Sequence, residues 1–402
     1  MTKHQSDICI VGNGAIGKVA ALGLAQIGLR VTLLGAAPGP APLAMSDAWD
    51  TRVYALNHVA RNLLATVKVW DALDSARIAA VEGMTVKGGT ADAAGNLMFD
   101  AYSARVEALA WIVEDRNLNQ ALDAALRFAS NVRVVSGRAK TMQVDAAGAS
   151  LQLESGETFG AALIIGADGA QSWVRSQCEI GIDYRSYKQR AVVANFECER
   201  LHHGVAYQWF TETEGIVALL PLPGKRVSLV WSAPDALAQT LLDEPLSQLA
   251  ARLSTLVGDK LGQLHPLQPE AAQAFPLSLL RTHALVAPSV ALIGDAAHVV
   301  HPLAGQGMNL GFADVAALIK VLAERGTHRD CGDAGVLARY ARLRKEETLL
   351  MQMTTDGLER LFAVDFEPLR MVRNVGLNLL DKLPVLKRRL MTHALGRTLE
   401  KD

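Results

Sequence analysis

The sequence predicts a mixed α/β protein with a parallel-sheet domain, an inserted antiparallel-sheet domain and C-terminal helices. Three stretches support this fold class. Residues 7–11 form an apolar strand pattern, followed directly by a glycine-rich turn and a helical pattern over residues 18–27. Residues 191–231 contain long β-type runs without a crossover helix, which is typical of an antiparallel sheet. Residues 290–318 return to a strand, a turn and a helix.

Composition narrows the class of protein. A chain of 402 residues, 50% of them hydrophobic, is long enough for two domains with a sizeable core. The formal net charge of −1 argues against nucleic acid as the main partner. Cys9, Cys178, Cys198 and Cys331 are widely spaced and form no CxxC pair, so we expect neither a disulfide framework nor a zinc site.

We expect neither a signal peptide nor a membrane-spanning helix. The first residues lead straight into a strand pattern, without a charged and then apolar leader. No apolar run reaches the roughly 18 residues that a spanning helix needs. These features favour a reduced, cytoplasmic setting.

A glycine motif with GxGxxG spacing lies between the first strand and the first helix. Gly12 is expected to make the tight turn, Gly14 to admit a pyrophosphate, and Gly17 to let the helix pack on the strand. Ala15 lies within the motif and is also expected to bind the ligand. Because residues 31–34 supply a second strand, this βαβ unit favours a dinucleotide ligand over a plain turn.

The second strand departs from the usual dinucleotide-binding pattern. It ends in Gly35, where an acidic residue that binds the adenosine ribose is expected, and the nearest acids are Asp47 and Asp50. A charge-assisted hydrogen bond contributes about 1.5–3 kcal/mol. We therefore expect weaker retention of the ligand, and tighter binding by a Gly35→Glu variant.

A second glycine-rich stretch follows the strand at residues 290–293. Gly294 and Asp295 form a turn with a carboxylate that can accept hydrogen bonds from hydroxyl groups. Residues 305–309 (GQGMN) contain glycines that let the backbone pass close to a planar ligand. They also begin a helix, where N–H groups and the helix dipole favour negative charge.

These motifs resemble those of the class A flavin-dependent aromatic hydroxylases, in particular the branch that hydroxylates ubiquinone precursors. The similar segments are GDAAHVVHPLAGQGMNLGFAD (residues 294–314), DTRVYAL (50–56) and GADGAQSWVR (166–175). The resemblance covers most of the chain and implies FAD as cofactor, bound by a Rossmann-like domain in the aromatic hydroxylase fold. It assigns FAD contacts to Gly294, Asp295, Pro302, Gly305, Gln306, Gly307, Met308, Asn309, Arg52, Arg116 and Asp168.

The two arginines in this set also have a purely structural interpretation. An arginine at the place of Arg52 reaches the cofactor pyrophosphate in the family. The alternative is a solvated charge at the start of a helical stretch, which we expect from residues 50–56. Arg116 is the candidate for a polar contact with the flavin chain, or else it pairs on the surface with Glu114 or Asp115.

Asp168 and a pair of histidines leave similar alternatives open. Asp168 would contact the ligand, or it would shape its loop by accepting backbone N–H groups. His298 and His301 could ligate a metal, but they lack further ligands at convincing spacing. Hydrogen bonding within the loop is the favoured interpretation of the histidines, and no metal is expected.

The resemblance also implies a reaction. Reduced FAD would react with O2 to give a C4a-hydroperoxide, which hydroxylates an electron-rich ring inside a closed apolar pocket. We therefore do not expect a catalytic side-chain acid or base to stand out in the sequence, and none does. The implied substrate is a polyprenylated phenol, and the electron donor is NAD(P)H or a redox protein. The alternatives are a hydroxylase of a soluble phenol and a non-catalytic flavin-fold subunit of a ubiquinone-biosynthesis complex.

The domain boundaries follow the changes of pattern. Residues 1–75, 103–181 and 276–335 are assigned to the FAD-binding domain, residues 76–102 and 182–275 to the substrate domain, and residues 336–402 to C-terminal helices. The basic, amphipathic tail over residues 362–396 would lie on an inner-membrane surface, dock a partner, or pack on its own protein.

Overall fold

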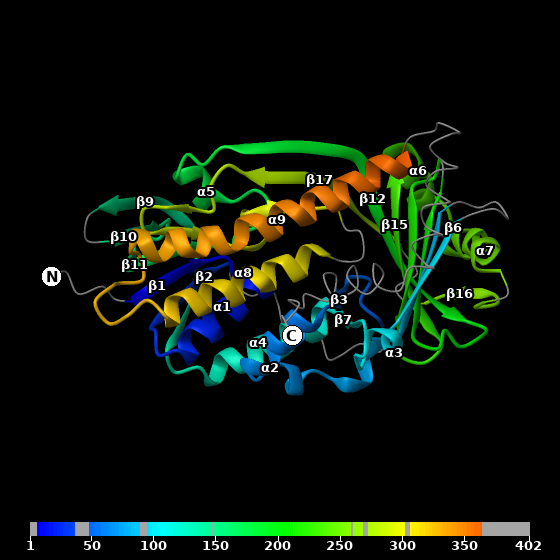
Figure 1. Ribbon diagram of the computed structural model, residues 1–402, viewed down its shortest axis with the longest axis horizontal. Helices are drawn as coiled ribbons and strands as arrows, with labels where there is room; N and C mark the ends of the chain where they lie inside the picture. Colours follow the sequence, from blue (N-terminus) through cyan, green and yellow to red (C-terminus); the bar gives the residue numbers. More distant parts are fainter. Residues whose placement is uncertain are drawn as a thin grey trace.

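The computed structural model describes residues 6–36, 48–88, 95–145, 148–211, 213–258, 260–267, 272–301 and 306–363. Within these residues the strands form sheets of eight, nine and three strands. The eight-stranded sheet and its helices occupy one half of the molecule, and the nine-stranded sheet extends to the other end (Figure 1).

The eight-stranded sheet is parallel at its centre, in the order β18-β19-β11-β1-β2-β8, with β10 and β9 added in antiparallel fashion beside β11. Its strands are β1 (Ser6–Val11), β2 (Val31–Gly35), β8 (Val132–Ser136), β9 (Ala139–Asp145), β10 (Gly148–Leu153), β11 (Thr158–Gly166), β18 (Val286–Ala287) and β19 (Val290–Leu292). Ile8 and Ile10 on β1 are fully buried, as expected for a strand covered on both faces.

Helices α1 (Ala15–Gln26), α4 (Asp115–Phe128) and α8 (Gln306–Ala323) pack together over this sheet. The contact between α1 and α8 is close, because a Cβ at Gly23 would lie only 2.3 Å from the Ile319 side chain. Helix α2 (His58–Thr66) lies against α8. Short helices α3 (Ala101–Ala104) and α5 (Trp173–Gln177) follow β6 and β11.

The nine-stranded sheet joins two separate parts of the chain, in the order β20-β17-β12-β15-β14-β13-β5-β6, with β16 beside β12. Its strands are β5 (Gly83–Gly88), β6 (Gly95–Asp100), β12 (Ile182–Cys198), β13 (Val205–Phe210), β14 (Ile216–Leu222), β15 (Arg226–Pro234), β16 (Leu264–Pro266), β17 (Gln273–Thr282) and β20 (His298–Val299). The pairing is antiparallel except between β13 and β5. Helices α6 (Asp235–Asp243) and α7 (Leu246–Val257) cover it, and their apolar faces form a second core with Trp231. The expected antiparallel sheet is therefore present, and through β17 it continues beyond residue 275.

The three-stranded sheet lies between these two and corrects one expectation. It contains β3 (Val53–Leu56), β7 (Ala110–Glu114) and β4 (Ile78–Val81), in the order β3-β7-β4. The segment at residues 50–56 does not begin a helix, because its backbone pairs with β7 instead. The helix starts only at His58, after Asn57 accepts a hydrogen bond from the Ala60 N–H and caps α2.

The long helix α9 (Ala334–Ala363) connects the two larger sheets. Tyr340 donates its hydroxyl to the Leu292 carbonyl on β19 at 2.8 Å, and Gln352 donates to the Leu280 carbonyl on β17 at 3.1 Å. Across the described residues, no helix has the length and apolar character needed to cross a membrane. Most of the basic tail expected at residues 362–396 lies outside the described residues.

Truncating Trp231 is expected to destabilise the chain through its second core. Trp231 is 1% exposed, and its Nε1 donates to the Glu214 carbonyl at 2.7 Å. Trp231→Ala should lower the free energy of unfolding by about 3–5 kcal/mol, and Trp231→Phe by less, because it refills most of the volume. Denaturant unfolding followed by circular dichroism measures both. Tyr184→Ala is the control on the same sheet, since Tyr184 is 62% exposed; an equal loss in all three variants would contradict this role.

Candidate functional site

The glycine turn after β1 leaves an opening at the start of α1. Gly12 has φ +115°, and a Cβ there would lie 2.2 Å from the Ala167 carbonyl oxygen. A Cβ at Gly17 would lie 1.9 Å from the Gly12 carbonyl oxygen, so both glycines are needed for packing. A Cβ at Gly14 would meet no atom of the described residues within 4 Å. Helix α1 begins at Ala15 without a side-chain cap or an acidic residue in its first turn, so its N–H groups can receive an anion.

The turn after β19 presents the Asp295 carboxylate. The turn, η3 (Gly294–Ala296), begins with Gly294 at φ +61°, a conformation that favours glycine. Asp295 is exposed, yet the surrounding protein desolvates its carboxyl and raises its pKa. The nearby charges of His298 and Arg52 partly oppose the rise, so the fold brings Arg52 close to Asp295.

A buried carboxylate fixes the position of this turn. Asp314 on α8 accepts hydrogen bonds from the Gly294 N–H at 2.9 Å, from His298 Nε2 at 2.7 Å and from Arg344 Nε at 2.7 Å. Burial alone would raise the pKa of Asp314, but the charges and hydrogen bonds of His298 and Arg344 hold it below its ordinary value. The sequence analysis missed this network. Asp314 stands in the recognised motif, but nothing in the motif identifies Arg344 on α9 as its partner.

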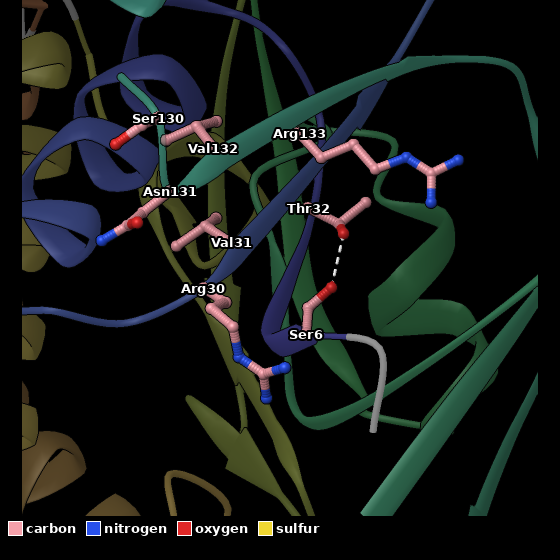
Figure 2. A pocket seen from close by; sticks show the side chains of 8 residues that line it. All are labelled: Ser6, Arg30, Val31, Thr32, Ser130, Asn131, Val132 and Arg133. Atoms are coloured by element: carbon pink, nitrogen blue, oxygen red, sulfur yellow. Dashed lines mark hydrogen bonds between the residues drawn. The ribbon is translucent and has the colours of Figure 1, made fainter. Parts of the chain in front are cut away.

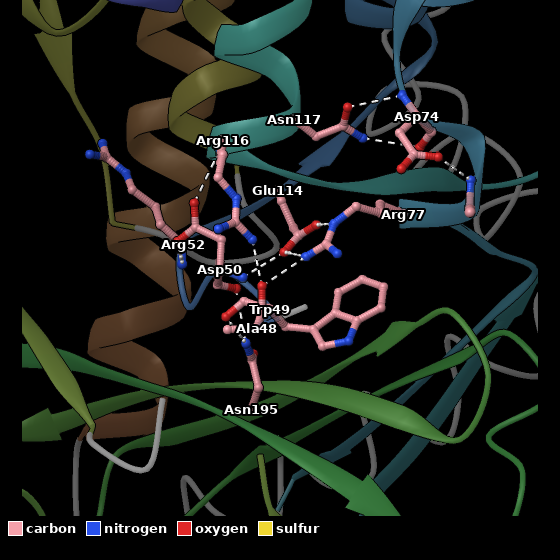
Figure 3. A network of polar contacts seen from close by, with 11 residues as sticks. Ala48, Trp49, Asp50, Arg52, Asp74, Arg77, Glu114, Arg116, Asn117 and Asn195 are labelled. Atoms are coloured by element: carbon pink, nitrogen blue, oxygen red, sulfur yellow. Dashed lines mark hydrogen bonds and ion pairs between the residues drawn. The ribbon is translucent and has the colours of Figure 1, made fainter. Parts of the chain in front are cut away.

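Arg52 lies in a loop at the junction of the sheets (Figure 3). The Asp50 carboxylate accepts the N–H groups of Arg52 at 2.9 Å and Arg116 at 3.1 Å. Asn195 of β12 donates its amide to the Asp50 carbonyl at 2.9 Å. The exposed Arg52 guanidinium lies 5.9 Å from the centre of the Phe275 ring on β17.

The same loop is anchored by a buried ion pair. Arg77 Nε lies 2.5 Å from Glu114 Oε2, and the Arg77 guanidinium stacks over the Trp49 ring at 4.3 Å. Glu114 also accepts the Asp50 N–H, and both Arg77 and Arg116 donate to the Ala48 carbonyl (Figure 3). Glu114 therefore pairs with Arg77, and Arg116 is brought to the backbone of the Arg52 loop.

Asp168 shapes the loop after β11. Its Oδ2 accepts the Val174 N–H at 3.0 Å, a contact of the loop-shaping kind. Its Oδ1 is buried and has no hydrogen-bond partner among the described residues. Arg175 then links this loop to the Asp295 turn, because it donates to the carbonyls of Ala170 at 2.8 Å and Ala296 at 2.9 Å.

The start of α8 is described only in part. Pro302 and Gly305 lie outside the described residues, as does the side chain of Gln306. A Cβ at Gly307 would meet no atom within 4 Å in the part of the chain that the structure describes, whereas Met308 packs against the core of the parallel-sheet domain. The Asn309 amide donates to the Ala55 carbonyl at 2.8 Å and accepts the Asn57 N–H at 3.0 Å, so the side chain joins α8 to β3.

The two histidines of the motif have different partners. His298 hydrogen-bonds Asp314, as described above, whereas His301 Nε2 lies 3.3 Å from the Gln189 amide oxygen. Burial lowers the pKa of His301 to about 4, so its ring is neutral at ordinary pH.

The end of β2 corrects the expectation for Gly35→Glu. A Cβ at Gly35 would lie 2.1 Å from Cγ and 2.4 Å from Cβ of Asn13. A side chain at position 35 therefore requires Asn13 to move. The single substitution cannot simply add the missing acid, and tighter ligand binding no longer follows from it.

A cavity of about 300 Å³ lies away from these residues (Figure 2). It is lined by Ser6, Arg30, Val31, Thr32, Ser130, Asn131, Val132 and Arg133, at the amino ends of β1, β2 and β8. Ligands of open parallel sheets bind at the carboxyl ends instead. Its arginines are already paired, Arg30 with Asp7 at 2.8 Å and Arg133 with Glu157 at 3.1 Å. This cavity is therefore no part of the candidate site.

Removing Arg344 should damage both stability and the Asp295 turn. Arg344→Met removes one of the two charged side chains that contact the buried Asp314 carboxylate, and breaking a buried ion pair in this way costs about 3–5 kcal/mol. Arg342→Met is the matched control, because Arg342 is exposed on the same helix. The measurement is denaturant unfolding, and equal stability of the two variants would contradict the role of Arg344.

The same network predicts a dependence on pH. The folded pKa of Asp314 lies below the ordinary 3.8, so its contribution to stability is present above that pH. The contribution is lost as the pH falls below 3.8 through the folded value. Unfolding curves at a series of acidic pH values should show this loss in the wild type, and Asp314→Asn should lack it.

The described residues fit an FAD molecule. Gly14 and the uncapped start of α1 leave room for a pyrophosphate. Arg52 supplies a cation near Asp295, and the exposed Asp295 carboxylate can accept hydrogen bonds from ribityl hydroxyl groups. The buried, unpartnered Oδ1 of Asp168 is a further acceptor beside this region.

Comparisons with known proteins agree with this fit. Residues 5–351 match the family described as "FAD binding domain". The chain is 36% identical to ubiquinone hydroxylase UbiL of Rhodospirillum rubrum, over 97% of this chain and 90% of that protein. It is 37% identical to 3-demethoxyubiquinol 3-hydroxylase of Escherichia coli, over 98% of this chain and 100% of that protein.

Solved structures show the same fold. PqsL of Pseudomonas aeruginosa superposes with a TM-score of 0.76 at 22% identity, covering 92% of this chain and 99% of that one. HpxO of Klebsiella pneumoniae, complexed with FAD and uric acid, gives a TM-score of 0.73 at 19% identity, with coverage of 96% and 97%. The chain belongs to the FAD-binding-domain family of flavin-dependent aromatic hydroxylases and is a monooxygenase with FAD as its cofactor.

Proposed function

We propose that this monooxygenase hydroxylates the ring of a polyprenylated phenol in ubiquinone biosynthesis. The observation that supports it most is similarity along nearly the whole chain to two proteins named as hydroxylases of ubiquinone or its precursor. A match of this extent includes the antiparallel sheet as well as the FAD-binding motifs. A hydroxylase of a soluble phenol and a non-catalytic subunit find no such support.

We propose that the FAD contacts are those expected from the sequence. Bound FAD supplies the redox chemistry that places one oxygen atom of O2 on the ring. Arg52 would neutralise phosphate charge, Asp295 would accept hydroxyl hydrogen bonds, and the open start of α1 would receive the pyrophosphate. The full proposed set is Gly12, Gly14, Ala15, Gly17, Arg52, Arg116, Asp168, Gly294, Asp295, Pro302, Gly305, Gln306, Gly307, Met308 and Asn309.

The protein's part in the chemistry would be positioning and the exclusion of water. Asp50 joins the Arg52 loop to β12 through Asn195, and Arg52 also lies beside Phe275 of β17. The cofactor region and the nine-stranded sheet thus meet at one junction, where an apolar ring could be held against the flavin. No side-chain acid or base is assigned to the reaction.

We propose the domain boundaries expected from the sequence, with the difference that β17 continues the substrate sheet to Thr282. We also propose NAD(P)H or a redox protein as electron donor, a cytoplasmic location, and peripheral contact with the inner membrane or a biosynthetic complex through the tail at residues 362–396. The basic residues of that tail support this last point.

Turnover with matched phenols tests the proposed substrate. With NAD(P)H and O2 supplied, the purified protein should reoxidise its reduced flavin faster when a prenylated phenol is present than when it is absent. The prenylated phenol should be converted to a hydroxylated product. The plain phenol should react more slowly, because it lacks the apolar chain that would bury surface on binding. Equal rates would favour the soluble-phenol alternative, and neither product nor acceleration would favour the non-catalytic one. Deletion of the gene, with analysis of the accumulated ubiquinone precursor, identifies the ring position.

Asp295→Asn is expected to weaken FAD binding. Loss of a charge-assisted hydrogen bond costs about 1.5–3 kcal/mol, or roughly 10-fold to 100-fold in affinity. Because the free carboxyl has a pKa above its ordinary 3.8, wild-type affinity should fall as the pH is lowered towards that raised value. The Asn variant should lose this dependence. Quenching of flavin fluorescence measures it, with the exposed Asp183→Asn as control; identical pH profiles for all three proteins would contradict the role.

A further inference from the structure

The end of β2 is shaped by Asn13, the second residue of the glycine motif. A Cβ at Gly35 would lie 2.1 Å from Asn13 Cγ, 2.4 Å from its Cβ and 2.4 Å from its Oδ1. The Asn13 side chain thus occupies the space that a side chain on the last residue of β2 would fill. Asn13 Nδ2 donates to the Ala36 carbonyl at 2.9 Å, which fixes the orientation of the amide.

The backbone gives no other reason for glycine at position 35. The backbone φ of Gly35 is not positive, so any amino acid can adopt this conformation. The Gly35 carbonyl accepts the Gly137 N–H at 2.9 Å, and the Gly12 N–H donates to the Leu34 carbonyl at 2.8 Å. These are ordinary contacts of a strand end. Glycine is required there because the Asn13 side chain takes the space.

The location of the Asn13 amide suggests its role. In dinucleotide-binding folds, an acidic residue at the end of the second strand binds the adenosine ribose. Here the Asn13 amide stands where the first atoms of that acidic side chain would be, next to the open Gly14 position. We propose that Asn13 replaces the acid, and that its Oδ1 accepts a hydrogen bond from a ribose hydroxyl of the adenosine half of FAD.

The chemistry of the amide is suited to this role but differs from that of a carboxylate. Because Nδ2 donates to the Ala36 carbonyl, Oδ1 is the atom of the side chain that accepts a hydrogen bond from a ligand. A neutral acceptor gives a weaker hydrogen bond than an ionised one. Asn13 therefore retains recognition of the ribose without the charge. The inference depends on FAD binding and goes beyond the proposed substrate, so it stands even if the phenol is a different one.

A binding experiment with two flavins tests the proposal. FMN ends at the ribityl phosphate and has no adenosine half, whereas FAD has both. Apoprotein is titrated with each, and binding is followed by flavin fluorescence. Asn13→Ala should bind FAD about 3-fold to 10-fold more weakly, the effect of one neutral hydrogen bond. Its affinity for FMN should remain that of the wild type.

Combined substitutions at positions 13 and 35 give a second, sharper readout. Asn13→Gly is used here, because even the Asn13 Cβ would lie 2.4 Å from a Cβ at position 35. In the wild-type background Asn13→Gly should weaken FAD binding. In the Gly35→Glu background the same change should tighten it, because it makes room for the carboxylate. The effect of removing Asn13 thus changes sign with the residue at position 35.

Three results would overturn the proposal. If Asn13→Ala weakens FAD and FMN equally, or leaves FAD binding unchanged, Asn13 only supports the turn through Ala36. If Asn13→Gly weakens FAD binding equally in both backgrounds, the two positions do not share one role. Thermal unfolding of each apoprotein identifies any variant that has lost its fold. Failure of phenol turnover would contradict the proposed function and leave these binding results unaffected.

Discussion

The position of the candidate flavin site depends on the buried carboxylate of Asp314. A desolvated charge is costly unless donors surround it, and here they come from the Asp295 turn, from His298 and from α9 through Arg344. The three donors meet at Asp314 only when the turn, α8 and α9 are assembled. The turn that carries Asp295 is therefore held in place relative to α8 and α9, and the Asp295 side chain is exposed.

A second constraint acts on the loop that carries Arg52. The loop at residues 48–52 has no regular structure, and it is held by Glu114 of β7, Arg77, Arg116 and Asn195 of β12. These residues come from two of the sheets and the helical segments next to them. Arg52 reaches the neighbourhood of Asp295 because this junction is assembled, so the site is a product of the contact between the sheets.

The departures from the sequence-based expectations share a physical cause. Residues 50–56 have a charged start that suits a helix. The segment forms a strand instead, because pairing with β7 satisfies its backbone hydrogen-bonding groups. Gly35 looks like a missing acid when the strand is considered alone, and Asn13 supplies the reason for it. In each case the deciding partner is distant in the chain.

The sequence by itself determined the parallel and antiparallel sheets, the βαβ unit, the family and its FAD cofactor. These follow from local periodicity and from contiguous motifs, in which neighbouring residues carry the signal. Only the tertiary structure decided that Arg344 holds the Asp295 turn, that Glu114 pairs with Arg77 and that Asn13 fills the place of a side chain at Gly35. Such pairings depend on the space and the charge that folding brings together, and no local pattern in one sequence specifies them.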